Sequence, residues 1–83
     1  MEEITMSQKE KYDKVFTEVF NVTPEQAENL AYQKHPAWDS VGHMRLMEQM
    51  ETAFDIFLDT EDVVGFSSYK IGQEILQKYG VKF

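Results

Sequence analysis

The sequence contains no cysteine. Neither disulfides nor thiolate metal sites can therefore stabilise this chain of 83 residues, and no side-chain thiol is available as a nucleophile. Any thiol chemistry carried out on this protein requires a thiol that comes from another molecule.

Long apolar runs are also absent. The segment from Met1 to Thr5 carries two acidic residues and no apolar run, and nowhere are there enough consecutive apolar residues for a signal peptide or a membrane span. We therefore expect a cytoplasmic protein that does not associate with membranes.

Basic residues are missing from a long central segment. Between Arg45 and Lys70 there is no lysine or arginine, and the net charge of the chain is −7. The acidic residues in this segment are Glu48, Glu51, Asp55, Asp59, Glu61 and Asp62. Such a segment repels nucleic-acid backbones and anionic lipid surfaces, but it attracts a basic protein surface. We therefore expect protein partners and no nucleic acid.

Apolar side chains are plentiful. They make up 42% of the residues, including six phenylalanines, four tyrosines and one tryptophan. This is enough for a packed core and too much for a disordered chain. Because so short a chain closes only one core, we expect a single domain, residues 1–83, that exists as a monomer.

Apolar residues recur at helical spacing in three segments, and capping residues mark the helix starts. Ser7 with Glu10 predicts a helix to about Asn21, and Thr23 followed by Pro24 predicts a short helical turn to about Leu30. The third segment runs from Asp39 and Ser40 to about Ala53. The expected core face of the first helix consists of Tyr12, Val15, Phe16, Val19 and Phe20. The apolar period of the next long helix consists of Val41, Met44, Met47, Met50 and Phe54, with Leu46 beside it. In the last helix the residues expected to face inward are Ile71, Ile75, Leu76 and Tyr79.

Other signals predict the connections. Residues 31–39 contain His35-Pro36, which disfavours helix, so we expect the end of a long loop there, anchored by Trp38. Residues 54–58 are expected to form a packed connector. Asp59 and Thr60 predict the start of a brief helix that runs through Val64 and is stopped by Gly65. A last helix is expected to begin at Ser67 or Ser68 and to end at Gly80. The prediction is a small all-α bundle with three longer helices, one or two short ones and a long first loop.

Ser40 is the residue most suited to carry a chemical group. A serine in the first turn of a helix lies where free backbone N–H groups and the positive end of the helix dipole favour a phosphate. The alternative is that Asp39 or Ser40 only caps the helix.

The run Trp38-Asp39-Ser40-Val41-Gly42-His43-Met44-Arg45-Leu46-Met47 resembles the prosthetic-group attachment motif of acyl carrier proteins, with valine in place of the usual leucine. Glu51 and Phe54 resemble the residues that close the family's modified helix, and the likeness extends over nearly the whole chain. It implies a four-helix bundle of acyl-carrier type with a short third helix.

The resemblance also implies a function. A phosphopantetheinyl transferase would join phosphopantetheine from coenzyme A to Ser40, with Asp39 and Val41 as neighbours in the motif. The arm would hold an acyl or aminoacyl group as a thioester for a biosynthetic or tailoring pathway. The chain itself would be a non-catalytic carrier, visited by acyl-loading and acyl-processing enzymes with basic surfaces.

The expected docking surface combines apolar and acidic residues. It consists of Val41, Met47, Glu48, Glu51, Glu61 and Asp62. The chain departs from many fatty-acid carriers at Arg45 and at Gly42-His43, where acidic or polar residues are common, so this surface is altered. The alternative function is a small acidic helical interaction module without a prosthetic group.

Metal sites receive no support from the sequence. His35 and His43 with Asp39 between them suggest zinc, but Pro36 interrupts the helical frame and no further strong ligand is near. The acidic segment after Asp55 lacks the glycine and the oxygen ligand that a calcium loop needs. No nucleophile with its base is present either, which disfavours an enzyme.

Overall fold

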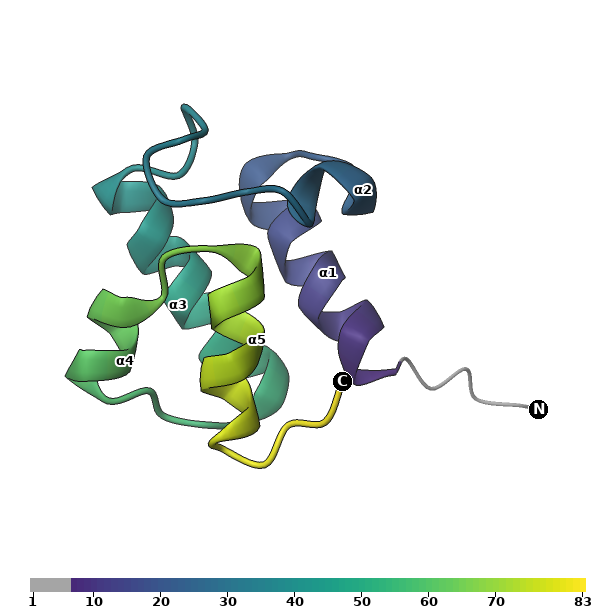
Figure 1. The fold of residues 1–83 in the computed structure, drawn as a ribbon, viewed down its shortest axis with the longest axis vertical. Coiled ribbons are helices and arrows are strands. Elements are labelled where there is room, and N and C mark those ends of the chain that lie inside the picture. The colour runs from purple at the N-terminus through teal and green to yellow at the C-terminus, as the bar shows by residue number, and fades with distance from the viewer. Residues whose placement is uncertain (1–6) are drawn as a thin grey trace.

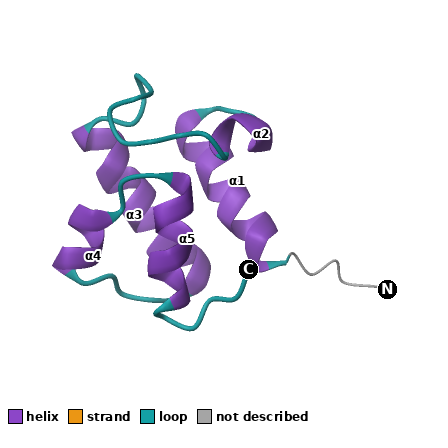
Figure 2. Ribbon diagram, in the orientation of Figure 1, coloured by secondary structure: helices purple, strands orange, loops and turns teal. Residues whose placement is uncertain are grey.

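Five helices follow one another in residues 7–83, the part of the chain that the computed structural model describes (Figures 1 and 2). They are α1 (Gln8–Phe20), α2 (Pro24–Ala27), α3 (Ser40–Phe54), α4 (Thr60–Gly65) and α5 (Tyr69–Gln77). These residues contain no strand, only one isolated bridge between Ala31 and Ser68. The all-α prediction is confirmed. The prediction that residues 1–5 do not begin a signal peptide concerns residues that the structure does not describe.

Helix starts agree closely with the capping residues in the sequence. Ser7 with Glu10 and Thr23 with Gln26 form complete capping boxes. Ser68 accepts a hydrogen bond from the backbone N–H of Ile71 and so begins α5. Side-chain capping therefore decides where these helices begin.

The helix ends depend on residues in the left-handed conformation. Asn21 after α1 and Asp55 after α3 have φ angles of 56° and 54°, which short polar side chains tolerate better than most. The last helix was expected to end at Gly80, but α5 ends at Gln77, and Gly80, with φ of 92°, ends the turn that follows it.

The end of α2 was also predicted wrongly: this helix stops at Ala27 and not near Leu30. The carbonyl of Leu30 accepts a hydrogen bond from the N–H of Tyr69, so the chain leaves the helix to pair with the start of α5.

A single aromatic-rich core joins the helices. Its fully buried side chains include Tyr12 and Phe16 of α1, Trp38 of the loop, and Phe66 before α5. Trp38 stacks on Phe20 with ring centroids 5.2 Å apart, so the prediction that it anchors the loop is confirmed. Figure 1 shows the C-terminal segment returning to the start of α1, where the ring of Phe83 packs against Tyr12.

Three apolar side chains of the predicted helical stripes are exposed, and of these only Ile71 was expected to face inward. Val41 is 70% exposed, Met44 57% and Ile71 42%. In α5 the buried residues are Tyr69, Gly72, Ile75 and Leu76, so the prediction is confirmed for Ile75 and Leu76. In α3 they belong to Gly42, Leu46, Met47 and Met50.

Gly42 explains how α3 approaches the loop. A Cβ atom there would lie 1.9 Å from the carbonyl oxygen of Ala37 and 3.3 Å from the ring of Phe20. Gly42 therefore lets α3 contact the loop at Ala37 and the ring of Phe20 closely. This contact sets the position of the residues around Ser40.

The loop before α3 is also fixed to α5. Tyr32 donates its backbone N–H to the carbonyl of Ser67 at 2.9 Å, and the N–H of Tyr69 donates to the carbonyl of Leu30 at 3.1 Å. This pair of bonds places Tyr32 opposite the first turn of α3. Every helix in residues 7–83 is too short or too polar to span a lipid bilayer.

Candidate functional site

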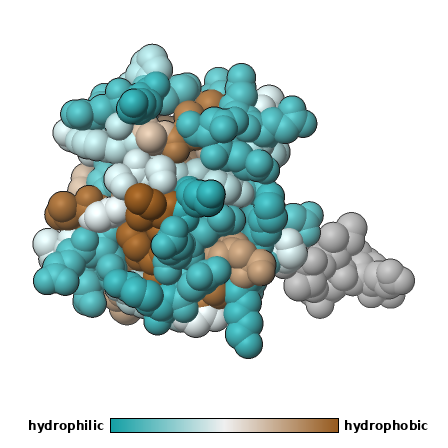
Figure 3. Space-filling view, viewed as in Figure 1, coloured by the Kyte–Doolittle hydropathy of each residue, from teal (hydrophilic) through white to brown (hydrophobic). Residues whose placement is uncertain are grey.

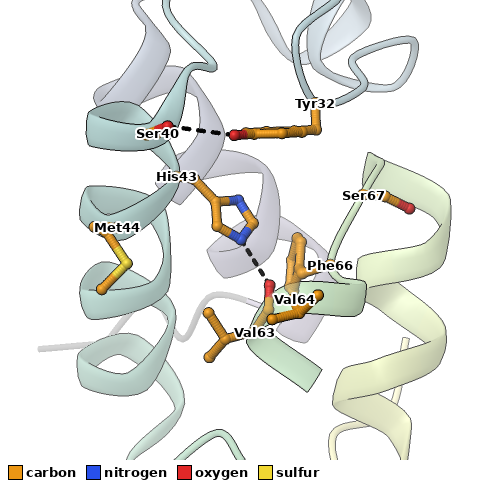
Figure 4. A pocket seen from close by; sticks show the side chains of 8 residues that line it. All are labelled: Tyr32, Ser40, His43, Met44, Val63, Val64, Phe66 and Ser67. Carbon is orange, nitrogen blue, oxygen red and sulfur yellow. Dashed lines mark hydrogen bonds between the residues drawn. The ribbon is translucent and has the colours of Figure 1, made fainter. Parts of the chain in front are cut away.

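Ser40 is the first residue of α3, and its side chain is exposed. Its Oγ lies 3.5 Å from the hydroxyl of Tyr32, as Figure 4 shows. The hydroxyl is therefore at the surface, where another molecule can reach it.

Asp39, and not Ser40, caps α3. The Asp39 carboxylate accepts a hydrogen bond from the backbone N–H of Gly42 at 2.9 Å. Of the two capping residues that the sequence offers, Asp39 is the cap and Ser40 is the first residue of the helix. The Ser40 oxygen has no part in holding the helix together.

His43 connects three parts of the molecule. Its Nδ1 accepts a hydrogen bond from the indole N–H of Trp38 at 2.9 Å, and its Nε2 lies 2.7 Å from the carbonyl oxygen of Val63 (Figure 4). An indole only donates and a carbonyl only accepts, so Nε2 carries the proton and donates it to Val63. His43 therefore bridges α3, the loop and α4.

A cavity lies between the start of α3 and α4. Its volume is about 350 Å³. The residues that line it are Tyr32, Ser40, His43, Met44, Val63, Val64, Phe66 and Ser67. Apolar side chains form much of the wall, and the hydroxyls of Tyr32 and Ser40 supply polar groups, whereas Figure 4 shows the Ser67 hydroxyl pointing away from the cavity. Such a mixture is typical of a site that binds a small organic group.

The surface around α4 shows the same apolar character. Figure 3 shows hydrophobic surface over α4 and the adjoining part of α5, with hydrophilic surface around it. Val64 of α4 is 77% exposed and lines the cavity. An apolar rim therefore lies close to Ser40.

The predicted docking residues do not all share this surface. Val41, Glu48 and Glu61 are exposed, as a docking role requires. Met47 is only 3% exposed because it faces the core, so its assignment as a surface contact is wrong. Met44, one turn after Ser40, is the exposed methionine of this helix.

Two of the predicted acidic docking residues have internal roles. Glu51 accepts a hydrogen bond from the backbone N–H of Leu58 at 2.9 Å and is half-buried. Asp62 is buried, with one carboxylate oxygen 2.7 Å from the ammonium of Lys78 and the other accepting from the hydroxyl of Tyr79. The prediction of Asp62 as part of an exposed acidic rim is wrong, since it ties α4 to the end of α5.

These contacts change the ionisation of Asp62. The hydrogen bond from Lys78, and then that from Tyr79, lower the pKa of the Asp62 carboxyl below its usual range. The carboxyl is therefore charged at neutral pH and engaged within the fold.

Residues 7–83 contain no group of three or more histidine, cysteine, aspartate or glutamate side chains placed to hold a metal ion. His35 lies in the loop, where its Nδ1 accepts from the N–H of Ala37 at 3.1 Å. His43 is engaged on both ring nitrogens.

The sequence reasoning missed His43 and Met44 as cavity residues. Their signal was present, because positions three and four residues after Ser40 lie on the same face of a helix. The residues from Tyr32, α4 and Ser67 had no such signal, because only the tertiary fold brings them to Ser40.

Comparison of the chain with protein-family models, with curated proteins and with solved structures gave no match.

Proposed function

We propose that this protein is an acyl carrier protein, which carries acyl or aminoacyl groups as thioesters on a phosphopantetheine arm joined to Ser40. In this proposal α1, α3, α4 and α5 are the four helices of the carrier bundle, and α2 belongs to its long first loop. The chain does no chemistry of its own, and a phosphopantetheinyl transferase is its modifying enzyme.

One observation carries the proposal: the Ser40 hydroxyl is exposed at the first residue of a helix of 15 residues, free of any capping role. The positive end of the helix dipole favours the phosphodiester that the arm would leave there. The motif around Ser40, which resembles that of the acyl carrier family, supports the same residue.

The absence of cysteine fits this role. A thioester carrier needs a thiol, and this chain has none of its own. The bound arm would supply that thiol, and a flexible tether raises the effective concentration of the carried group at each docked enzyme.

Partners with basic surfaces suit the exposed face of α3 and α4. Glu48 and Glu61 are exposed there, together with the apolar side chains of Val41, Met44 and Val64. Charges at the edge of an interface mainly affect the association rate and the choice of partner.

The test is the intact mass of the protein after coexpression with a broad-specificity phosphopantetheinyl transferase. We expect a mass gain of one phosphopantetheine, which is lost in Ser40→Ala and retained in Ser67→Ala, a serine on the rim of the same cavity. Ser40→Ala should keep the helical circular dichroism of the parent protein. An unmodified protein, under conditions that load a control carrier, contradicts the proposal.

The second candidate is an acidic interaction module without a prosthetic group. The exposed Phe57, 89% accessible in the connector between α3 and α4, favours a protein-binding role that does not need Ser40. A partner bound equally well by the parent protein and by Ser40→Ala, with no mass gain in the transferase experiment, supports this second candidate.

A further inference from the structure

Tyr32 points its hydroxyl at Ser40 from the loop before α3. The two side-chain oxygens lie 3.5 Å apart, and Figure 4 shows the phenol ring extending towards the first turn of the helix. Within residues 7–83 the Tyr32 hydroxyl has no other hydrogen-bond partner. A contact of this length to an exposed serine hydroxyl adds little to the stability of the fold. Stability alone therefore gives no reason for a hydroxyl at this position.

The fold holds this side chain in place. The backbone N–H of Tyr32 donates to the carbonyl of Ser67 at 2.9 Å. The phenol ring is half-buried and meets the imidazole of His43 edge to face, with ring centroids 5.3 Å apart. Because the backbone and the ring are both held, the hydroxyl stays beside Ser40.

The start of α3 adds two further hydrogen-bond donors. In residues 7–83 the backbone N–H groups of Ser40 and Val41 have no hydrogen-bond partner, whereas the next two donate to Asp39. No lysine or arginine is among the residues that line the adjoining cavity. Three neutral donors, two on the helix and one on the loop, therefore lie around the Ser40 oxygen, and such groups suit an anionic oxygen.

We propose that Tyr32 is a binding residue for the phosphate that links the arm to Ser40. Its hydroxyl donates a hydrogen bond to a phosphate oxygen, while the first N–H groups of α3 donate from the helix. A hydrogen bond to a charged oxygen is stronger than one to the neutral serine hydroxyl. The contact restricts rotation of the phosphate and hence the direction in which the arm leaves the protein. This inference rests on the proposed carrier function.

The first test uses a phosphate that needs no transferase. Phosphoserine is incorporated in place of Ser40 by genetic encoding, and its phosphate is titrated by ³¹P NMR in the chain with Tyr32 and in Tyr32→Phe. A hydrogen bond donated to the doubly charged phosphate favours that form, so it lowers the phosphate pKa, which is about 6 in phosphoserine. We therefore expect this pKa to be about 0.5 higher in Tyr32→Phe.

The control carries phosphoserine in place of Ser67. The Ser67 hydroxyl points away from the cavity, although the carbonyl of the same residue accepts the backbone N–H of Tyr32. A general disturbance of the loop by Tyr32→Phe would reach this phosphate, whereas the loss of one hydrogen bond at Ser40 would not. We expect the phosphate at position 67 to titrate at the same pH with and without the hydroxyl. Imidazoles also titrate in this range, so the ring resonances of His43 are recorded in the same samples.

A second measurement needs no substitution of Tyr32. The ¹³C resonance of the ring carbon that bears its hydroxyl should shift when phosphoserine replaces Ser40. The chain has three other tyrosines, whose hydroxyls bond elsewhere in the fold and whose resonances should stay in place. The urea midpoint of Tyr32→Phe without phosphate should match that of the parent protein, because the 3.5 Å contact contributes little to folding.

The phosphodiester of the arm is tested last. In protein loaded with phosphopantetheine, Tyr32→Phe should shift the ³¹P resonance of the phosphodiester. An equal phosphate pKa with and without the Tyr32 hydroxyl, or an unchanged phosphodiester resonance, would overturn this proposal and would not affect the carrier function. Failure of the transferase to load the chain would instead reject the carrier function, while the phosphoserine titration still decides whether Tyr32 contacts a phosphate on Ser40.

Discussion

The contact between α1 and α5 and the contact between α3 and α4 are built in opposite ways. Between α1 and α5, Tyr12 packs on Tyr69 with ring centroids 4.8 Å apart, and its hydroxyl donates to the carbonyl of Tyr69. Gly72 leaves no room there, since a Cβ atom would lie 2.3 Å from the ring of Phe66 and the hydroxyl of Tyr12. Between α3 and α4, one hydrogen bond from His43 crosses beside an open cavity.

This difference shows how a small domain combines a tightly packed core with an open cavity at its surface. Tightly packed aromatic rings on one side provide the burial that holds the fold together. The other side can then remain loosely packed and exposed without unfolding the chain. Changes in the first region should affect stability, and changes in the second should affect binding.

The largest effect is expected from Gly72→Ala. The added methyl group has no space between Tyr12 and Phe66, and overpacking of this kind costs about 1–3 kcal/mol. Urea denaturation followed by circular dichroism measures the loss. In the matched control Gly65→Ala, at the end of α4, the nearest contact is 4.0 Å away, so the change should stay within about 0.5 kcal/mol. Equal effects of the two substitutions would contradict the comparison.

Alkaline pH should weaken the α1–α5 contact next. Burial, followed by the hydrogen bond to Asp13, raises the pKa of Tyr69 to about 12, and burial also raises that of Tyr12. An unfolded tyrosine has a pKa of about 10, so the stabilisation is complete below pH 10 and is lost as the pH rises towards 12. Urea midpoints measured between pH 9 and 12 should fall, and Tyr69→Phe should flatten that fall.

Acid should release α4 from the end of α5. Because the pKa of Asp62 is lowered in the folded state, its contribution is present above the unfolded value of about 3.9 and is lost as the pH falls below it. We expect Asp62→Asn to be less stable than the parent at pH 7, with the difference shrinking between pH 4 and 2. A difference that stays constant over this range would show that Asp62 does not act through its charge.

The smallest change in stability is expected at the cavity rim. Val64→Ser replaces an exposed apolar side chain, so the free energy of unfolding should stay within about 0.5 kcal/mol of the parent. Urea denaturation followed by circular dichroism measures the difference. A large loss of stability would mean that the rim is part of the core.

Much of the fold was predictable because its signals are local. Capping residues placed the starts of α1, α2 and α5 within one residue. Left-handed residues such as Asp55 gave no comparable signal, yet α3 still ended within one residue of the prediction, since the apolar stripe stops there.

The orientation of α3 was harder to predict because this helix has two apolar stripes. One passes through Val41 and Met44, the other through Leu46 and Met50, and only the second faces the core. The buried stripe begins at Gly42, whose missing side chain hid it from a pattern of apolar residues. This stripe is buried because the loop before α3 packs on it at Gly42.

The candidate site was predictable at Ser40 and not beyond it. Its exposed hydroxyl follows from position at a helix start, which the sequence specifies. The role of Asp62 depends on Lys78 and Tyr79, 16 and 17 residues away, and that of His43 depends on Val63, 20 residues away. Such pairings arise only when the helices assemble.

The backbone bonds between the loop and the start of α5 have a further consequence for Ser40. Tyr32 and Leu30 are held by Ser67 and Tyr69 before anything binds. The conformational entropy of this connector is therefore lost during folding, and a molecule that engages Ser40 finds a preorganised backbone and does not have to order one.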